Sequence, residues 1–154
     1  MNRTIHALVA LFGAAALASA AVSPARADDE VIEGRLRACQ PGDPAIGGIA
    51  ACSRAWKLRA GTVDLERDGE LEVDLKGLVP ADGASGATAV ALALVCAGEG
   101  GPVVAAPRHF ELAPRGTAHI ETRLALPARC LAPSVVVREF RDGAAGDWIA
   151  VSGY

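Results

Sequence analysis

Apolar and charged residues alternate strictly along two neighbouring segments of the chain, 62–66 and 70–75. This period of two is typical of half-buried β-strands. A two-residue turn between the segments would set apolar side chains opposite charged ones on the same face. A three-residue turn ending at Gly69, with this glycine in the left-handed conformation, removes that conflict. We therefore predict a β-hairpin in this register, and its core-facing pairs are Leu65 with Leu71 and Val63 with Val73.

The same reasoning predicts a second hairpin from segments 108–112 and 118–124, around the turn Pro114-Arg115-Gly116. Proline and glycine are favoured at these turn positions. Phe110 and Ile120 would then face each other on the core side. The outward cross-strand pairs would be Glu111 with His119 and His109 with Glu121.

Four further strands are predicted by short apolar or alternating runs, at 55–59, 88–96, 134–140 and 147–151. Segment 87–97 also has a helix-like composition, but its apolar residues fit one face of a strand, which we favour. Segment 39–52 has no usable period, and residues 28–53 are expected to be an irregular N-terminal loop region. About eight short strands separated by Gly/Pro turns predict an all-β fold, a single antiparallel β-sandwich such as the immunoglobulin-like one.

Residues 1–27 have the features of a cleavable signal peptide. Arg3 provides a basic start, residues 7–22 are apolar, and Ala25-Arg26-Ala27 forms a cleavage motif, with a second possible cut after Ala20. The apolar run is shorter than the roughly 20 residues that a membrane span requires. We expect a secreted or periplasmic protein without a transmembrane segment in its mature chain.

Cleavage after Ala27 would leave residues 28–154 as a single domain. Removing Arg3 and Arg26 changes Lys+Arg from 15 to 13 against 18 Asp+Glu, so the mature formal charge is 13 − 18 = −5. A negative chain of this kind argues against a nucleic-acid partner. The expected partner is another protein or a component of the cell envelope.

The four cysteines allow three disulfide pairings, among which the sequence does not choose. We favour Cys39 with Cys52, which would close the irregular Pro/Gly-rich loop, and Cys96 with Cys130, which would tie a predicted strand to the 127–133 connection. Both bonds would suit an oxidising compartment. A thiol or metal site would instead need reduced cysteines, and the chain lacks the Cys-x-x-Cys spacing.

The predicted second hairpin also presents candidate metal ligands on one face: His109, His119, Glu111 and Glu121. Imidazole and carboxylate together suit zinc or copper. The alternative is that these residues form two weak charge pairs on a solvated sheet face. A metal centre would also require further groups that hold the imidazoles in place.

The first hairpin places five carboxylates on its outer face, where they repel one another: Asp64, Glu66, Glu70, Glu72 and Asp74. A neighbouring strand carrying Lys57 and Arg59, or the nearby Arg67 and Lys76, would offset that repulsion. The residues are then expected to form an ordinary solvated face. The alternative is that this face binds calcium or a basic partner, although no EF-hand-like loop is present in the sequence.

Trp56 and Trp148 are expected to be core anchors, with an exposed sugar-binding platform as the alternative. The sequence contains no Gly-x-Ser-x-Gly motif and no suggestive order of Ser, His and Asp. We therefore expect no catalytic residues.

The run GTVDLERDGELEVDLKGL at 61–78 resembles the opening hairpin of the CHRD domain, a secreted β-sandwich module named after chordin. GEGGPVV at 98–104 is similar to the Gly-rich turn and following strand of that family. The resemblance implies a CHRD-like antiparallel sandwich in an exported protein. The His-x-His pair of that family is missing from strand 89–94, so no metal-linked role carries over from the family.

Together these features predict an exported, non-catalytic β-sandwich module with a binding or structural role and no required cofactor. Two alternatives remain. One is a divalent-metal-binding protein that uses the His/Glu face of the second hairpin, and the other is a small hydrolase with an unrecognised site.

Overall fold

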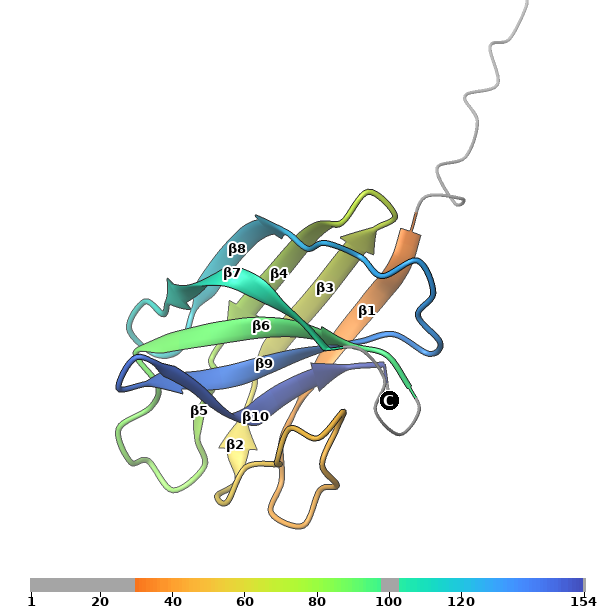
Figure 1. Cartoon of the computed structure of the whole chain (residues 1–154). Helices are drawn as coiled ribbons and strands as arrows, with labels where there is room; N and C mark the ends of the chain where they lie inside the picture. The colour runs from red at the N-terminus through yellow and green to blue at the C-terminus, as the bar shows by residue number, and fades with distance from the viewer. Residues whose placement is uncertain (1–29, 98–102, 154) are drawn as a thin grey trace, which may run out of the picture.

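The computed structural model describes residues 30–97 and 103–153, and all regular structure in these ranges is β (Figure 1). The predicted signal peptide and its cleavage site lie outside the described residues. No helix in the described ranges is long and apolar enough to cross a membrane. The strands are β1 (Glu30–Ala38), β2 (Trp56–Lys57), β3 (Ala60–Glu66), β4 (Glu70–Lys76), β5 (Val79–Pro80), β6 (Ala89–Val95), β7 (Val103–Glu111), β8 (Ala118–Arg123), β9 (Ser134–Arg141) and β10 (Ala144–Ser152).

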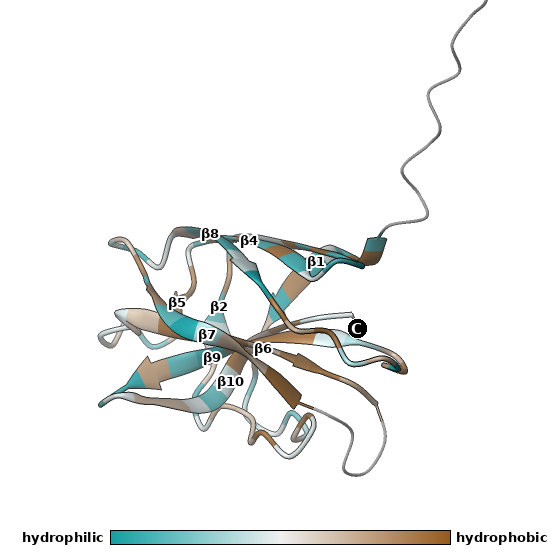
Figure 2. Cartoon of the chain, turned by 45° about the horizontal axis from the view of Figure 1, so that its top comes forward, coloured by the Kyte–Doolittle hydropathy of each residue, from teal (hydrophilic) through white to brown (hydrophobic). Residues whose placement is uncertain are grey.

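Eight strands form one antiparallel sheet in the order β7-β6-β9-β10-β1-β3-β4-β8, and β2 pairs with β5 in a small separate sheet. The large sheet folds over itself, so that β8, β4 and β1 form one layer above β7, β6, β9 and β10 in Figure 2. Strand β1 belongs to both layers, because Glu30–Arg35 pair with β3 and Leu36–Ala38 pair with β10. The predicted antiparallel sandwich is confirmed.

The core lies between the two layers and consists of the inward-facing residues of both. Alternate residues of β3 and β4 are buried, whereas β6 and the second half of β10 are buried almost throughout. Trp56 and Trp148 are 2% and 0% exposed, and the Trp148 Nε1–H donates a hydrogen bond to the Pro44 carbonyl. Both tryptophans are therefore core anchors, and the sugar-platform alternative is wrong.

The first hairpin has the predicted register, with Leu65 opposite Leu71 and Val63 opposite Val73. Gly69 has a φ of 90°, and its N–H donates to the Glu66 carbonyl. A side chain at this position would collide with the Leu124 carbonyl, which adds a steric reason for glycine. The alternating sequence and this turn together determine which residues face the core.

Both favoured disulfides are present, Cys39–Cys52 and Cys96–Cys130. The first closes the irregular segment between β1 and β2. The second ties the end of β6 to the connection between β8 and β9. Two disulfides indicate an oxidising compartment, because cytosolic thiols are kept reduced.

The prediction that residues 28–53 are irregular is wrong for 30–38, which form the nine-residue strand β1. A break in pairing between Glu30 and Ile32 interrupts its alternation, and only Leu36 in this strand is fully buried. The strand also changes its pairing partner from β3 to β10 after Arg35, so its two halves have different neighbours. No single two-residue period therefore extends along its sequence.

The second hairpin prediction is also wrong, although both of its strands exist. Strand β7 pairs with β6 in one layer, and β8 pairs with β4 in the other. The turn between them, closed by the Ala113–Thr117 bridge, carries the chain across the sandwich. Phe110 and Ile120 are buried as expected, but they enter the core from opposite layers.

Candidate functional site

The outer side of the layer β1-β3-β4-β8 carries an excess of carboxylates, and we call it the acidic face. Alternation along each strand and the register between strands place the side chains there. All five predicted acidic residues are included, with three more from β1 and β8. Its carboxylates are Glu30, Glu33, Asp64, Glu66, Glu70, Glu72, Asp74 and Glu121, and its Lys and Arg residues are Arg35, Lys76 and Arg123.

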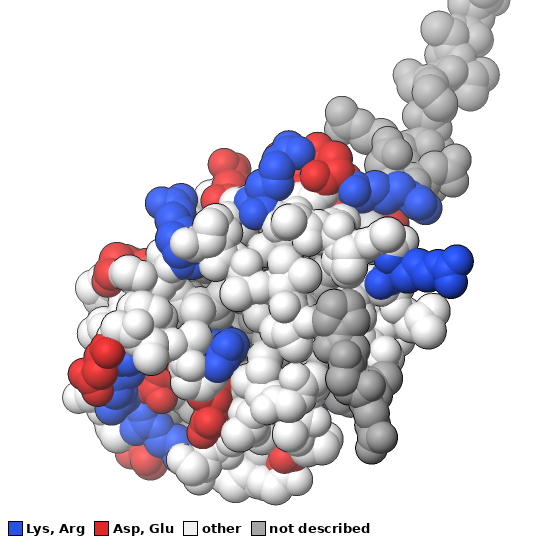
Figure 3. All heavy atoms as spheres, in the orientation of Figure 1, with Lys and Arg blue, Asp and Glu red and all other residues white. Residues whose placement is uncertain are grey.

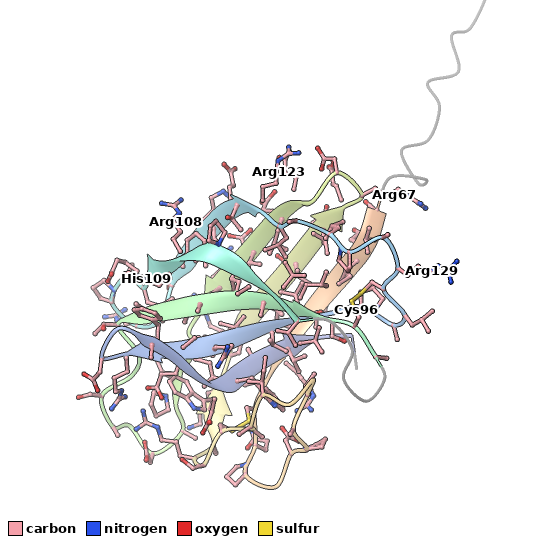
Figure 4. The ribbon with its side chains drawn as sticks, viewed as in Figure 1. Arg67, Cys96, Arg108, His109, Arg123 and Arg129 are labelled. Atoms are coloured by element: carbon pink, nitrogen blue, oxygen red, sulfur yellow. A yellow bond between two sulfur atoms is a disulfide. The ribbon has the colours of Figure 1, made fainter. Side chains whose placement is uncertain are left out.

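One of the cationic groups that offset this charge, Arg123, lies on strand β8. Arg123 faces Glu70 in register, and its guanidinium lies 3.0 Å from Asp68 Oδ2 and 3.5 Å from Glu70 Oε2. Arg123 stands at the upper edge of the molecule in Figure 4. The expectation that the strand carrying Lys57 would provide the offset is wrong, because β2 pairs with β5 and not with the hairpin. Arg123 instead meets the carboxylates at the turn end of the hairpin.

Charge repulsion remains at the β1 edge of the acidic face. The pKa of Glu30 is raised, first by the nearby Glu33 carboxylate, then by partial desolvation and by Asp64. In register, Glu30 lies opposite Glu66 and Glu33 lies opposite Asp64. Like charges that face each other across strands are unfavourable, so this edge favours a bound cation.

Asp64 lies at the centre of this edge, and its Oδ1 atom is shielded from solvent without a hydrogen-bond partner among the described residues. A shallow hollow of about 450 Å³ lies over it, and Glu33, Arg35 and Glu72 contribute to its lining. A buried carboxylate oxygen without a donor is costly. The hollow is therefore a place where a ligand that donates hydrogen bonds would be stabilised.

His119 lies on the same face, surrounded by carboxylates on both sides of its ring. Its Nδ1 atom lies 3.3 Å from Asp74 Oδ1 and 3.8 Å from Glu72 Oε1, and its Nε2 atom lies 3.3 Å from Glu121 Oε1. Hydrogen bonds to Glu121 and then to Asp74 raise the pKa of His119, with smaller contributions from the charges of Asp74 and Glu72. Glu72, Asp74 and His119 each offer one ligand atom, and these atoms lie within 4.8 Å of one another.

The four predicted metal ligands are not brought together, because they belong to strands in different layers. His109 and Glu111 lie on β7, where His109 stacks on Phe140 with ring centroids 4.2 Å apart and lies 3.7 Å from Glu111. Figure 4 shows His109 on the front layer, away from the edge that carries Arg123. The other half of the prediction, His119 and Glu121, instead joins two residues of the acidic face.

A second hollow, of about 700 Å³, lies beside the stacked His109 and Phe140 rings. Arg54 and Arg141 also line it, and both contact Glu139, at 3.5 and 2.6 Å. The Arg54 guanidinium is further held over the Trp56 ring. Opposite charges are therefore paired beside this hollow.

Charge is unevenly distributed over the molecule. In the view of Figure 3, charged side chains gather along the upper rim and at the lower left, and the middle of that view is largely uncharged. The large apolar residues with the greatest exposure in the described ranges are Leu131, at 75%, and Val103, at 41%. Leu131 lies in a loop and Val103 begins β7, so the two do not form one extended apolar strand face.

In comparisons with protein families, curated proteins and solved structures, the chain matched none of them. The resemblance of the first hairpin to the CHRD domain therefore stays a prediction.

Proposed function

We propose that this protein is an exported, non-catalytic binding module that recognises a cationic ligand through its acidic face. The observation that carries the proposal is the unsatisfied Asp64 Oδ1, beneath a hollow on a face where carboxylates outnumber Lys and Arg. A ligand ammonium or guanidinium group supplies both the charge and the hydrogen-bond donor that this oxygen lacks.

The position of the acidic residues on strands supports a binding role. Paired strands hold side chains at fixed spacings, and the ladders β1-β3-β4-β8 connect every residue of this face. A preorganised charged surface costs little conformational entropy when a ligand binds. The signal-peptide features of residues 1–27, together with two disulfides, support export.

The test is calorimetric titration of the disulfide-intact protein with a lysine-only octapeptide, compared with a glutamate-only octapeptide. We expect binding of the lysine peptide that weakens as salt is raised. Glu33→Gln and Glu66→Gln remove charges from β1 and β3, and each should weaken binding by up to about five-fold. Glu111→Gln, at a 78% exposed site on β7, is the matched control and should leave binding unchanged.

Binding of both peptides with equal affinity, or equal effects of Glu33→Gln and Glu111→Gln, would refute the assignment of the acidic face. Asp64→Asn provides a second criterion. It should weaken binding of the lysine peptide while making the free protein no less stable, because it removes the charge from an oxygen that has no partner.

A further inference from the structure

We propose that Glu72, Asp74 and His119 form a divalent-metal centre on the acidic face, with Glu121 as the residue that positions the imidazole, and that its metal is zinc. This inference rests on the proposed function, since it names one cation that the acidic face binds. It concerns strands β4 and β8, whereas the unsatisfied Asp64 lies on β3.

The distances between the ligand atoms fit one small cation. Bonds from zinc to nitrogen and oxygen of about 2.0–2.2 Å place neighbouring ligands of a tetrahedral site roughly 3.4 Å apart. His119 Nδ1 lies 3.3 Å from Asp74 Oδ1 and 3.8 Å from Glu72 Oε1. Small side-chain rotations are enough to place all three atoms around one ion.

The backbone presets this arrangement. Glu72 and Asp74 are two residues apart on β4, so their side chains emerge on the same side of the sheet. His119 faces Asp74 directly in the β4–β8 ladder. Because the positions of all three ligands are fixed by strand pairing, the ion does not have to order a loop in order to bind.

Glu121 provides the positioning contact that a metal-bound histidine needs. Its Oε1 atom lies 3.3 Å from Nε2 of His119, on the opposite side of the ring from Asp74 and Glu72. A carboxylate at this nitrogen fixes the proton on Nε2, leaves the Nδ1 lone pair for the metal and makes the imidazole a stronger ligand. Three carboxylates around one imidazole also leave an excess of negative charge for a divalent ion to neutralise.

Asp64, which also carries the proposed function, lies beside one of the three ligands. It faces Glu72 across the β3–β4 ladder, both residues line the hollow, and its Oδ1 atom has no donor among the described residues. Water bound to a divalent cation is a strong hydrogen-bond donor, of the kind that this oxygen lacks. Water on a cation held at Glu72 would thus donate a hydrogen bond to Asp64, which is not itself a ligand.

The ligand set favours zinc over the alkaline-earth ions. Calcium takes six to eight oxygen ligands, and magnesium usually keeps several waters and binds one or two carboxylates, whereas one imidazole with two carboxylates is a set that zinc accepts readily. With three protein ligands, a fourth position remains for water. Copper is the competitor that the same ligands would admit.

The experiment is titration of the chelator-treated, disulfide-intact protein with zinc chloride, followed by calorimetry and native mass spectrometry. We expect one zinc per chain and no binding of calcium at the same concentration. His119→Ala should weaken zinc binding by about 100-fold. His109→Ala is the matched control, since His109 is similarly exposed and also lies beside a glutamate, and it should bind zinc normally.

Glu121 has its own test, because it acts through His119. Glu121→Ala should weaken zinc binding by about ten-fold, and Glu121→Gln should restore part of the loss, since its amide oxygen still accepts from Nε2–H. Nitrogen chemical shifts of the His119 ring should report the Nε2–H tautomer when zinc is bound. A Glu121→Ala protein with unchanged affinity and tautomer would refute the positioning role.

Failure of this centre and failure of the proposed function give different results. Absence of zinc binding, or equal losses in His109→Ala and His119→Ala, would overturn the metal centre. If the lysine octapeptide still bound, the acidic-face function would stand alone. Zinc binding without any binding of the lysine octapeptide would instead support the metal centre and refute recognition of organic cations. Glu72→Gln tests a second of the three zinc ligands. Its side chain is exposed, so this substitution leaves the core intact.

Discussion

His119 on β8 lies directly opposite Asp74 on β4, with 3.3 Å between Nδ1 and Oδ1. The two side chains are 55% and 37% exposed, so the contact is screened by water and contributes little to folding. Its significance is geometric, because strand pairing fixes the distance between an imidazole and a carboxylate that are 45 residues apart in the sequence.

The first prediction concerns the coupling of these two residues in metal binding. If both hold the same zinc ion, the Asp74→Asn and His119→Ala effects on affinity should not add, because either change alone largely destroys the centre. The double variant should bind zinc about as weakly as His119→Ala, as measured by competition with a chromophoric chelator. Additive losses would show that the two residues act at separate sites.

The second prediction uses two glycines with similar backbone angles in different surroundings. Gly116 has a φ of 67° and Gly143 a φ of 79°. A Cβ at Gly116 would collide with the Leu78 backbone, whereas a Cβ at Gly143 would meet nothing within 4 Å. Gly143→Ala should cost about 1–2 kcal/mol from backbone strain alone. Gly116→Ala should cost clearly more in urea unfolding, and equal costs would contradict the steric argument.

The third prediction concerns Trp148, which is fully buried and hydrogen-bonded to the Pro44 carbonyl. Trp148→Ala should lower the free energy of unfolding by about 3–5 kcal/mol, because it leaves a cavity where the buried indole ring is packed. Trp148→Phe keeps most of the apolar volume but leaves the carbonyl without its donor, and should cost less. Chemical denaturation of the two variants gives the comparison, and the reverse order would contradict it.

The fourth prediction compares the two disulfides, which close loops of sequence separation 13 and 34. Under the loop-entropy relation they stabilise the fold by at most about 3 and 4 kcal/mol, respectively. Replacing both cysteines of one bond by alanine should therefore be somewhat more damaging for Cys96–Cys130 than for Cys39–Cys52. Urea unfolding of the two double variants measures this order. The reverse order would show that the cavity left at the buried Cys39 outweighs the difference in loop entropy.

The fifth prediction concerns the acid stability of the loop after β1. The Arg37 guanidinium donates to Asp43 Oδ2 at 2.7 Å and the Gln40 N–H donates at 2.8 Å, and these bonds lower the pKa of Asp43. A carboxyl whose pKa is lower in the folded state stabilises the fold above its unfolded pKa of about 3.9. That contribution is lost as the pH falls through the lower folded pKa.

Asp43→Asn should therefore be less stable than the parent protein at pH 7. The difference should begin to shrink below about pH 4, where the carboxyl of the unfolded chain becomes protonated, and continue to shrink until the folded carboxyl is protonated as well. Arg37→Gln should reduce the same pH dependence, since it removes the largest cause of the shift. Urea unfolding at pH 7 and pH 2.5 checks both variants. A difference that is unchanged with pH would show that Asp43 acts through its shape and not its charge.

Local features were predictable from the sequence wherever one strand or one turn contains the information. The alternation around Gly69 predicted both the side that Leu65 faces and its partner Leu71, because a tight turn fixes register. The cysteine pairing that we favoured is the one that forms, although the sequence allows three. Burial of Phe110 and Ile120 also followed from alternation alone.

Features that depend on which strands are neighbours were not predictable. Alternation placed His119 and Asp74 on solvent-facing sides, but nothing local showed that β8 lies beside β4. Ala113 and Thr117 form a single bridge across a short turn, as at the end of a hairpin. The strands on either side of this turn nevertheless belong to different layers. Alternation alone therefore predicts Glu111 as the partner of His119, whereas the fold provides Asp74.

Strand β1 has a consequence for the order in which this chain folds. It is paired on one side with β3 and on the other with β10, with Leu36 opposite Ser152. Because synthesis proceeds from the N-terminus, β1 emerges long before the strand that completes its second edge. The hairpin of β3 and β4 can form early, but the sandwich closes only when β10 has been made. Until then, the edge of β1 at Leu36–Ala38 is open to pairing with other chains, which favours aggregation of any form that lacks β10.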